Sequence, residues 1–198
     1  MSLLSHLDKN PKSQLIFDFD NTLVHLMINW DEWFEGIERE LSSLDHDLIV
    51  KGKNGQLNLS ELQNSFVEKF GKDIRNKIIV HNREFEQKAL KGIKINQELV
   101  DQIKVLFGKK YLWTSNTRQT VVPILNQMGI LQFMEKIITR DDVTYIKPKI
   151  DGFEFIYDPD IPKNEYLLIG DSGSDEKASG EAGIDFYKIT YFGDFANL

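Results

Sequence analysis

The chain has 198 residues, and its 31 Asp and Glu outnumber its 24 Lys and Arg, which gives a formal net charge of −7. This balance argues against a nucleic-acid-binding protein, which would show a basic face, and the lack of cysteine excludes disulfides and thiolate metal sites. No stretch approaches the ~20 apolar residues of a membrane span, and residues 1–8 lack the basic and apolar regions of a secretory signal. We therefore expect a cytoplasmic globular protein of one or two domains, a monomer or weak homodimer, with no nucleic-acid or membrane partner.

The first predicted element is a buried strand, because residues 15–17 form a short apolar run that leads into acidic residues. No run between residues 25 and 92 predicts a further strand. Helical spacing and a capping-box match at Ser60 predict three helices there instead, over residues 30–41, 60–70 and 74–90. The polar residues 45–55, with two glycines, are interpreted as a loop.

From residue 96 onward, helices and strands alternate. Asn96 is the predicted N-cap of a helix that ends at Gly108. Pro123 is tolerable only near the first turn of the next helix, which ends at Gly129. The later elements are strands at 111–113, 136–139, 166–169 and 186–189, with helices at 152–157 and 174–182. This alternation predicts an α/β fold with right-handed crossovers, a parallel sheet and helices on both faces.

Polar residues stand where several of these strands end. Asp18 and Asp20 follow the first strand, Ser115 and Asn116 the second, and Asp171 a later one. The carboxyl ends of parallel strands are where ligands bind in open α/β sheets. Neighbouring carboxylates repel, so a divalent cation is their natural partner, and oxygen ligands indicate Mg²⁺. Taken alone, an Asp-x-Asp pair is equally typical of a plain turn, and a serine of a helix cap.

Four segments, in this order, resemble the haloacid dehalogenase-like hydrolase superfamily: DFDNTLV, YLWTSN, KPKIDGF and LLIGDSGSDEKASGEAGI. They span most of the chain outside residues 25–95. The resemblance implies a Rossmann-like core of residues 1–24 and 93–198, with the strand before Asp18 at its centre. It also implies that residues 25–92 form an inserted all-helical cap of the family's small type. Two positions depart from the family pattern, since Asn21 stands where Gly is common and Ile150 where a second Pro is common.

The resemblance further implies a role for each motif residue. Asp18 would be the nucleophile that forms an aspartyl-phosphate, and Asp20 the acid for the leaving alcohol and then the base for water. Lys147 would neutralise charge between the nucleophile and the phosphate. The substrate phosphate would contact Ser115, Asn116 and Asn21. Mg²⁺ would be held by the Asp18 carboxylate, the Asp20 backbone carbonyl and Asp171, with Asp175 orienting these ligands.

The function implied by the resemblance is Mg²⁺-dependent hydrolysis of a small phosphorylated metabolite, a phosphate monoester. The chain looks most like the phosphoglycolate phosphatase-type branch. A phosphomutase of the beta-phosphoglucomutase type shares every core residue, and a nucleotidase is a further alternative. A non-catalytic phosphate-binding module is disfavoured because Asp18 and Asp20 are both intact. The cap would select the substrate but has no recognisable motif, and Arg83 and Arg118 are weaker candidates for substrate contact.

Overall fold

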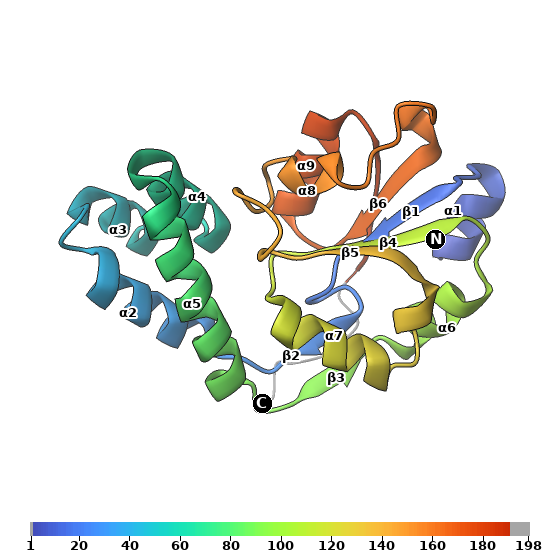
Figure 1. Ribbon diagram of the computed structural model, residues 1–198. Helices are drawn as coiled ribbons and strands as arrows, with labels where there is room; N and C mark the ends of the chain where they lie inside the picture. Colours follow the sequence, from blue (N-terminus) through green and yellow to red (C-terminus); the bar gives the residue numbers. More distant parts are fainter. Residues whose placement is uncertain (1, 191–198) are drawn as a thin grey trace.

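The protein folds as a parallel β-sheet with helices on both faces. The structure is a computed structural model that describes residues 2–190. The five strands lie in the order β5-β4-β1-β6-β7, and every neighbouring pair is parallel (Figure 1). Their bounds are Gln14–Phe17 for β1, Lys109–Trp113 for β4, Met134–Ile138 for β5, Tyr166–Gly170 for β6 and Asp185–Lys188 for β7. The α/β class, the parallel sheet and the central position of the first strand are thereby confirmed.

The alternation of side chains along β1 separates the two layers of helices. Leu15 and Phe17 pack in one apolar cluster with α1 (Leu3–Lys9), α6 (Gln97–Val105) and α7 (Arg118–Gln127). Ile16 packs on the opposite face, with α8 (Asp151–Glu154) and α9 (Gly173–Ala182). Successive residues of a strand point to opposite faces, so one buried strand contributes to both clusters. Figure 1 shows α8 and α9 on one side of the sheet and α6 and α7 on the other.

Four helices lie, in sequence, between the two strands of a short antiparallel pair. Strand β2 (Val24–Leu26) pairs antiparallel with β3 (Ile93–Ile95). Between them lie α2 (Trp30–Leu41), α3 (His46–Lys53), α4 (Leu59–Phe70) and α5 (Lys72–Ala89), which we call the helical insert. The insert has an apolar cluster of its own, which includes Trp33, Ile49 and Phe66. The division of the chain into a core and a cap domain remains an interpretation of this arrangement.

Several predicted elements need correction. Residues 45–55 are not a loop, because the Asp45 side chain accepts the Leu48 N–H and caps α3, whose Ile49 is buried. The capping box of α4 belongs to Asn58 and Glu61 rather than to Ser60. Pro123 lies inside α7 and not near its first turn. Strands β2 and β3 were not predicted, since a strand of three residues is too short to show a periodic pattern.

Polar contacts join the helical insert to the loops at the carboxyl edge of the sheet. Asn64 of α4 pairs with the backbone of Ile146 through both amide atoms, at 2.7 and 3.0 Å. Glu86 of α5 is buried and accepts the Thr117 hydroxyl at 2.6 Å. The insert therefore stands over the strand ends that carry the predicted site. Within residues 2–190, no helix combines the length and apolar character needed to cross a membrane.

Candidate active site

Four strand ends converge on one cavity of about 490 Å³. Its lining includes Asp18 after β1, Ser115 after β4, Arg140 after β5 and Asp171 after β6, together with residues of the helical insert. Parallel strands end at the same edge of a sheet, so these four side chains are brought together although they are far apart in sequence. Every predicted site residue except Asp175 lines this cavity.

Lys147 joins the two most buried carboxylates of the site. Its Nζ donates to Asp18 Oδ1 at 2.5 Å and also to Asp175 Oδ1. Asp175 is fixed in turn by Ser172, whose backbone N–H and hydroxyl donate to Asp175 Oδ2 at 3.1 and 2.5 Å. Ser172 and Asp175 thus form a reciprocal capping box at the start of α9. This box fixes Asp175, and Asp175 in turn fixes Lys147.

Burial dominates the electrostatics of Asp18. Desolvation, together with repulsion from Asp175, raises its pKa to about 8, although Lys147 opposes the change. Burial disfavours the charged form of Lys147, but Asp175 and Asp18 outweigh it and raise the lysine pKa above its ordinary value. The lysine is therefore a permanent cation, and additional positive charge would stabilise the ionised form of Asp18.

Asp20 is held in place by strand β2, which precedes the helical insert. Its Oδ1 accepts the backbone N–H of Leu26 in β2 at 2.8 Å and that of Asn21 at 3.1 Å. Desolvation by burial raises the pKa of Asp20 to about 7, although these two bonds lower it. A carboxyl group with this pKa can give a proton near neutral pH and accept one back.

Three carboxylates could hold a cation. Oxygens of Asp18, Asp171 and Asp175 lie within 4.8 Å of one another, whereas the Asp20 carboxylate is not in this group. Thr22, which the sequence analysis did not single out, donates to Asp18 at 3.2 Å and to Asp171 at 3.3 Å. Burial and the Asp175 charge raise the pKa of Asp171. The raised pKa values of Asp18 and Asp171 fit a site for a hard divalent cation, since its charge would offset the repulsion among these carboxylates.

The three residues predicted to contact phosphate all line the cavity. The Ser115 carbonyl accepts Arg140 Nε at 2.5 Å, and Asn116 Oδ1 accepts the Thr114 hydroxyl at 2.9 Å. Asn21 has a left-handed backbone with φ 59°, where Gly is common in the family. Its backbone N–H already donates to the Val24 carbonyl at 2.6 Å, so a phosphate would have to compete for this amide. The phosphate-binding roles remain predictions.

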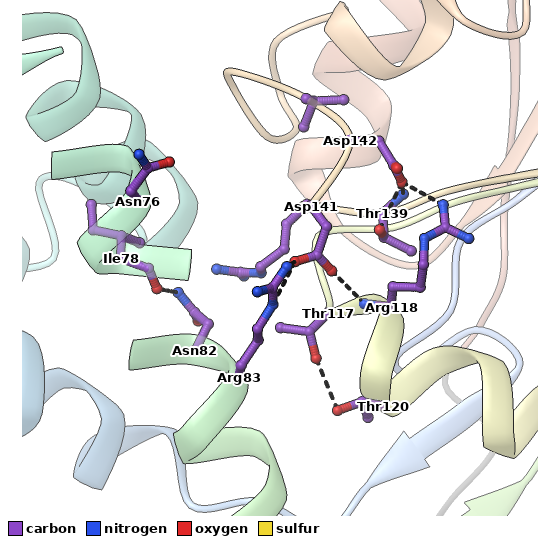
Figure 2. Close-up of polar contacts among 12 residues, drawn as sticks. Asn76, Ile78, Asn82, Arg83, Thr117, Arg118, Thr120, Thr139, Asp141 and Asp142 are labelled. Carbon is purple, nitrogen blue, oxygen red and sulfur yellow. Dashed lines mark hydrogen bonds and ion pairs between the residues drawn. The ribbon is translucent and has the colours of Figure 1, made fainter. Parts of the chain in front are cut away.

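The insert contributes six residues to the cavity, from the N-terminal parts of α2 and α4: Trp30, Trp33, Asn58, Leu59, Ser60 and Gln63. Two residues named as candidates for substrate contact lie elsewhere. Arg83 pairs with Asp141 at 2.6 Å and Arg118 with Asp142 at 2.6 Å, and neither arginine lines the cavity (Figure 2). Arg140, which does, was missed, although its place just after β5 matches that of the other site residues.

Several solved structures share this fold. A protein described as a haloacid dehalogenase-like hydrolase, from Bacteroides fragilis, aligns with TM-score 0.64 at 19% identity over 93% of this chain and 91% of that one. The Bacillus subtilis HAD-hydrolase YfnB, bound to magnesium, aligns with TM-score 0.52 at 19% identity over 88% and 85%. A protein described as a phosphoglycolate phosphatase, from Lactobacillus plantarum, aligns with TM-score 0.50 at 19% identity over 88% and 84%.

These identities are low, so the structural likeness establishes the fold and not the activity. A search of curated proteins gave no significant match. The sequence profile of the haloacid dehalogenase-like hydrolases, however, matches residues 15–189, from β1 to the end of the last strand. All four motif segments fall inside that match, and their acids and lysine gather around one cavity. The chain therefore belongs to the haloacid dehalogenase-like hydrolase family.

Proposed function

We propose that the protein is a Mg²⁺-dependent phosphatase that hydrolyses a small phosphate monoester through an aspartyl-phosphate on Asp18. The observation that carries the proposal is the 2.5 Å contact between Lys147 Nζ and Asp18 Oδ1 in a cavity that Asp20 and Asp171 also line. A nucleophilic carboxylate, a fixed cation and a second acid of suitable pKa are the groups that phosphoryl transfer through an enzyme ester requires.

In the first step, an Asp18 carboxylate oxygen attacks phosphorus while the bond from phosphorus to the leaving oxygen breaks. Asp20 gives its proton to that oxygen, for which its pKa of about 7 is suited. In the second step, Asp20 takes a proton from water, the water oxygen attacks phosphorus, and phosphate leaves with Asp18 restored. Lys147 stays charged throughout and offsets the negative charge between Asp18 and the phosphoryl group.

The donor set supports a metal ion in this scheme. Asp18, the Asp20 backbone carbonyl and Asp171 would hold Mg²⁺, with Asp175 and Thr22 orienting the carboxylates. When bound, the ion would supply positive charge to the phosphoryl oxygens. The similar protein YfnB is bound to magnesium, which agrees with this assignment.

The size of the cavity supports a small metabolite as the substrate. A volume of about 490 Å³ is in the range of small-molecule sites. The helical insert covers the strand ends through the Asn64 and Glu86 contacts, so we propose that it acts as a cap that excludes water and selects the leaving group.

Phosphate release from a panel of phosphorylated sugars, nucleotides, small acids and an aryl phosphate tests the proposal. We expect turnover of at least one alkyl phosphate and of the aryl phosphate, loss of both after EDTA, and recovery with Mg²⁺. Turnover that survives exhaustive chelation would contradict the metal assignment. Absence of turnover on the whole panel with Mg²⁺ present would contradict the phosphatase.

A further inference from the structure

Arg140 is a buried cation that forms no ion pair with any of residues 2–190. It is 5% exposed and is the only arginine among the described residues that line the cavity. Its Nε donates to the Ser115 carbonyl at 2.5 Å, and its Nη1 donates to Gln63 Oε1 at 2.7 Å. Both acceptors are neutral oxygens. A guanidinium carries five N–H donors, so most of them have no protein acceptor among the described residues.

The nearby acids do not neutralise this charge. Burial lowers the pKa of Arg140, and Glu86 and Asp141 oppose that change from beyond ion-pair distance. Both carboxylates have other partners, since Glu86 accepts from Thr117 and Asp141 accepts from Arg83 and from the Arg118 backbone N–H (Figure 2). A buried charge without a partner is costly. The arrangement therefore favours an anion in the cavity beside Arg140.

A chain of amide groups fixes the direction of the guanidinium. Gln63 Oε1 also accepts Asn82 Nδ2 at 3.2 Å, and Gln63 Nε2 donates to the Leu59 carbonyl at 3.1 Å. Asn82 Oδ1 in turn accepts Trp33 Nε1 at 2.8 Å. The Nε side of Arg140 is thus tied to the end of β4, and its Nη1 to the helical insert. Nη1 therefore lies beside α4 of the insert, which is proposed to contact the leaving group.

Lys147 and Arg140 have different partners in the cavity, and the third cation that lines it, Lys177, is paired with Glu61 at 2.7 Å. Lys147 is committed to Asp18 and Asp175, where the phosphoryl group would react. We propose that Arg140 binds a second anionic group, a carboxylate or a second phosphate, on the leaving-group part of the substrate. This inference rests on the proposed function and narrows its substrate class to phosphate monoesters with two anionic ends. An arginine suits this role because its planar donors match the oxygens of either anion.

The test is a binding measurement that needs no turnover. Phosphonates with an ω-carboxylate and alkylphosphonates of equal length, with two to four carbons, are titrated calorimetrically into the protein in Mg²⁺ buffer. We expect the carboxylated compound of the best length to bind about 10- to 100-fold more tightly, as for a hydrogen-bonded charge pair. Arg140→Gln should remove this preference, and Arg140→Lys should restore part of it. Arg83→Gln is the matched control, because Arg83 joins the insert to the core but lies off the cavity, and it should keep the preference.

Gln63→Glu is a second variant, which loses only the Nε2 donor to the Leu59 carbonyl and keeps Arg140. It places a carboxylate where Nη1 now meets an amide oxygen, so the guanidinium gains an internal partner. We expect the preference to fall to about threefold or less, and the melting temperature reports whether the fold is kept. Equal binding of the two series by the wild-type protein, or an unchanged preference in Arg140→Gln, would overturn the proposal, as would failure of both series to bind.

The outcomes separate this inference from the proposed function. Preferential binding of the carboxylated series without phosphate release from any ester would refute the phosphatase and retain Arg140 as an anion site. Phosphate release that is equally fast from esters of neutral and of carboxylated alcohols would retain the phosphatase and refute the role of Arg140.

Discussion

The two sides of the cavity are built from different chemistry. On the sheet side, Asp18, Lys147 and Asp175 form a chain of charged contacts whose ends are anchored at β1 and at the start of α9. On the insert side, the lining consists of two tryptophans, two amide side chains, Leu59 and Ser60, and one of the amides, Gln63, contacts Arg140 of the core. The carboxylates and Lys147 therefore lie where bonds would be broken, and uncharged side chains of the insert lie where the rest of the substrate would bind.

This contrast predicts different kinetic effects on the two sides. Groups that act on developing charge in the transition state contribute mainly to kcat, while groups that contact the substrate equally throughout contribute mainly to KM. Substitutions of Asp18, Asp20 and Lys147 should therefore lower kcat steeply, and substitutions in the insert should raise KM. A residue that violated this division would show that the insert takes part in the chemistry.

The largest effect is expected for Asp18→Asn. An amide cannot act as the nucleophile, so kcat should fall by on the order of 10⁴-fold or more. The fold should survive, because the change removes repulsion between Asp18 and its acidic neighbours Asp175 and Asp171. Activity is measured by phosphate release, and folding by the melting temperature. More than a few per cent of wild-type activity in a verified variant would exclude Asp18 as the nucleophile.

Lys147→Ala should lower kcat by on the order of a hundredfold, as expected for one preorganised charge. The same change leaves Asp18 and Asp175 buried without their cation, so the melting temperature should fall by roughly 10 °C. Lys147→Arg is the control, since it keeps the charge and should recover stability more than activity. Rates at saturating substrate separate the two effects, and a change confined to KM would assign Lys147 to binding alone.

The sequence predicted the residues on the sheet side of the cavity better than those that contact the insert. Asp18, Ser115 and Asp171 each follow a short apolar strand, so a local pattern placed them at one edge. Arg140 also follows a strand, but an arginine in a loop has no local signature, and its burial results from contacts with Gln63 and Ser115. Helix α3 was taken for a loop because its sequence is polar and the packing of Ile49 against residues distant in sequence helps to stabilise it. Tertiary contacts decide such cases, and they are not visible in local spacing.

On the insert side, Trp30→Ala should raise KM for the best substrate about tenfold and change kcat by less than about threefold. Trp30 lines the cavity and also packs on the apolar cluster of the insert. Phe34→Ala is a matched control, because Phe34 belongs to the same helix and packs on the same cluster but does not line the cavity. If both variants changed KM equally, the effect would come from loosening of the insert and not from substrate contact.

The smallest predicted effect concerns the stability of the protein stripped of divalent cations. The pKa values of Asp18 and Asp20 are raised from 3.8 to about 8 and about 7. An acid whose pKa is higher in the folded state binds more protons there, so its stabilising contribution is present at low pH and is lost as the pH rises through the folded pKa. Between pH 6.5 and 8, the free energy of unfolding should therefore fall by about 2 kcal/mol, which lowers the melting temperature by roughly 5 °C.

Mg²⁺ should reverse this trend, because a cation bound to the ionised carboxylates offsets the repulsion that raises their pKa. Thermal melts in EDTA and in Mg²⁺ at pH 6.5, 7.2 and 8 measure the effect, and the difference between the two conditions should grow with pH. Asp18→Asn removes one of the two titrating groups, so its melting temperature in EDTA should depend less on pH. A melting temperature in EDTA that stayed constant or rose from pH 6.5 to 8 would show that these carboxylates are already ionised without a metal, and the electrostatic reason for placing a cation between them would be lost.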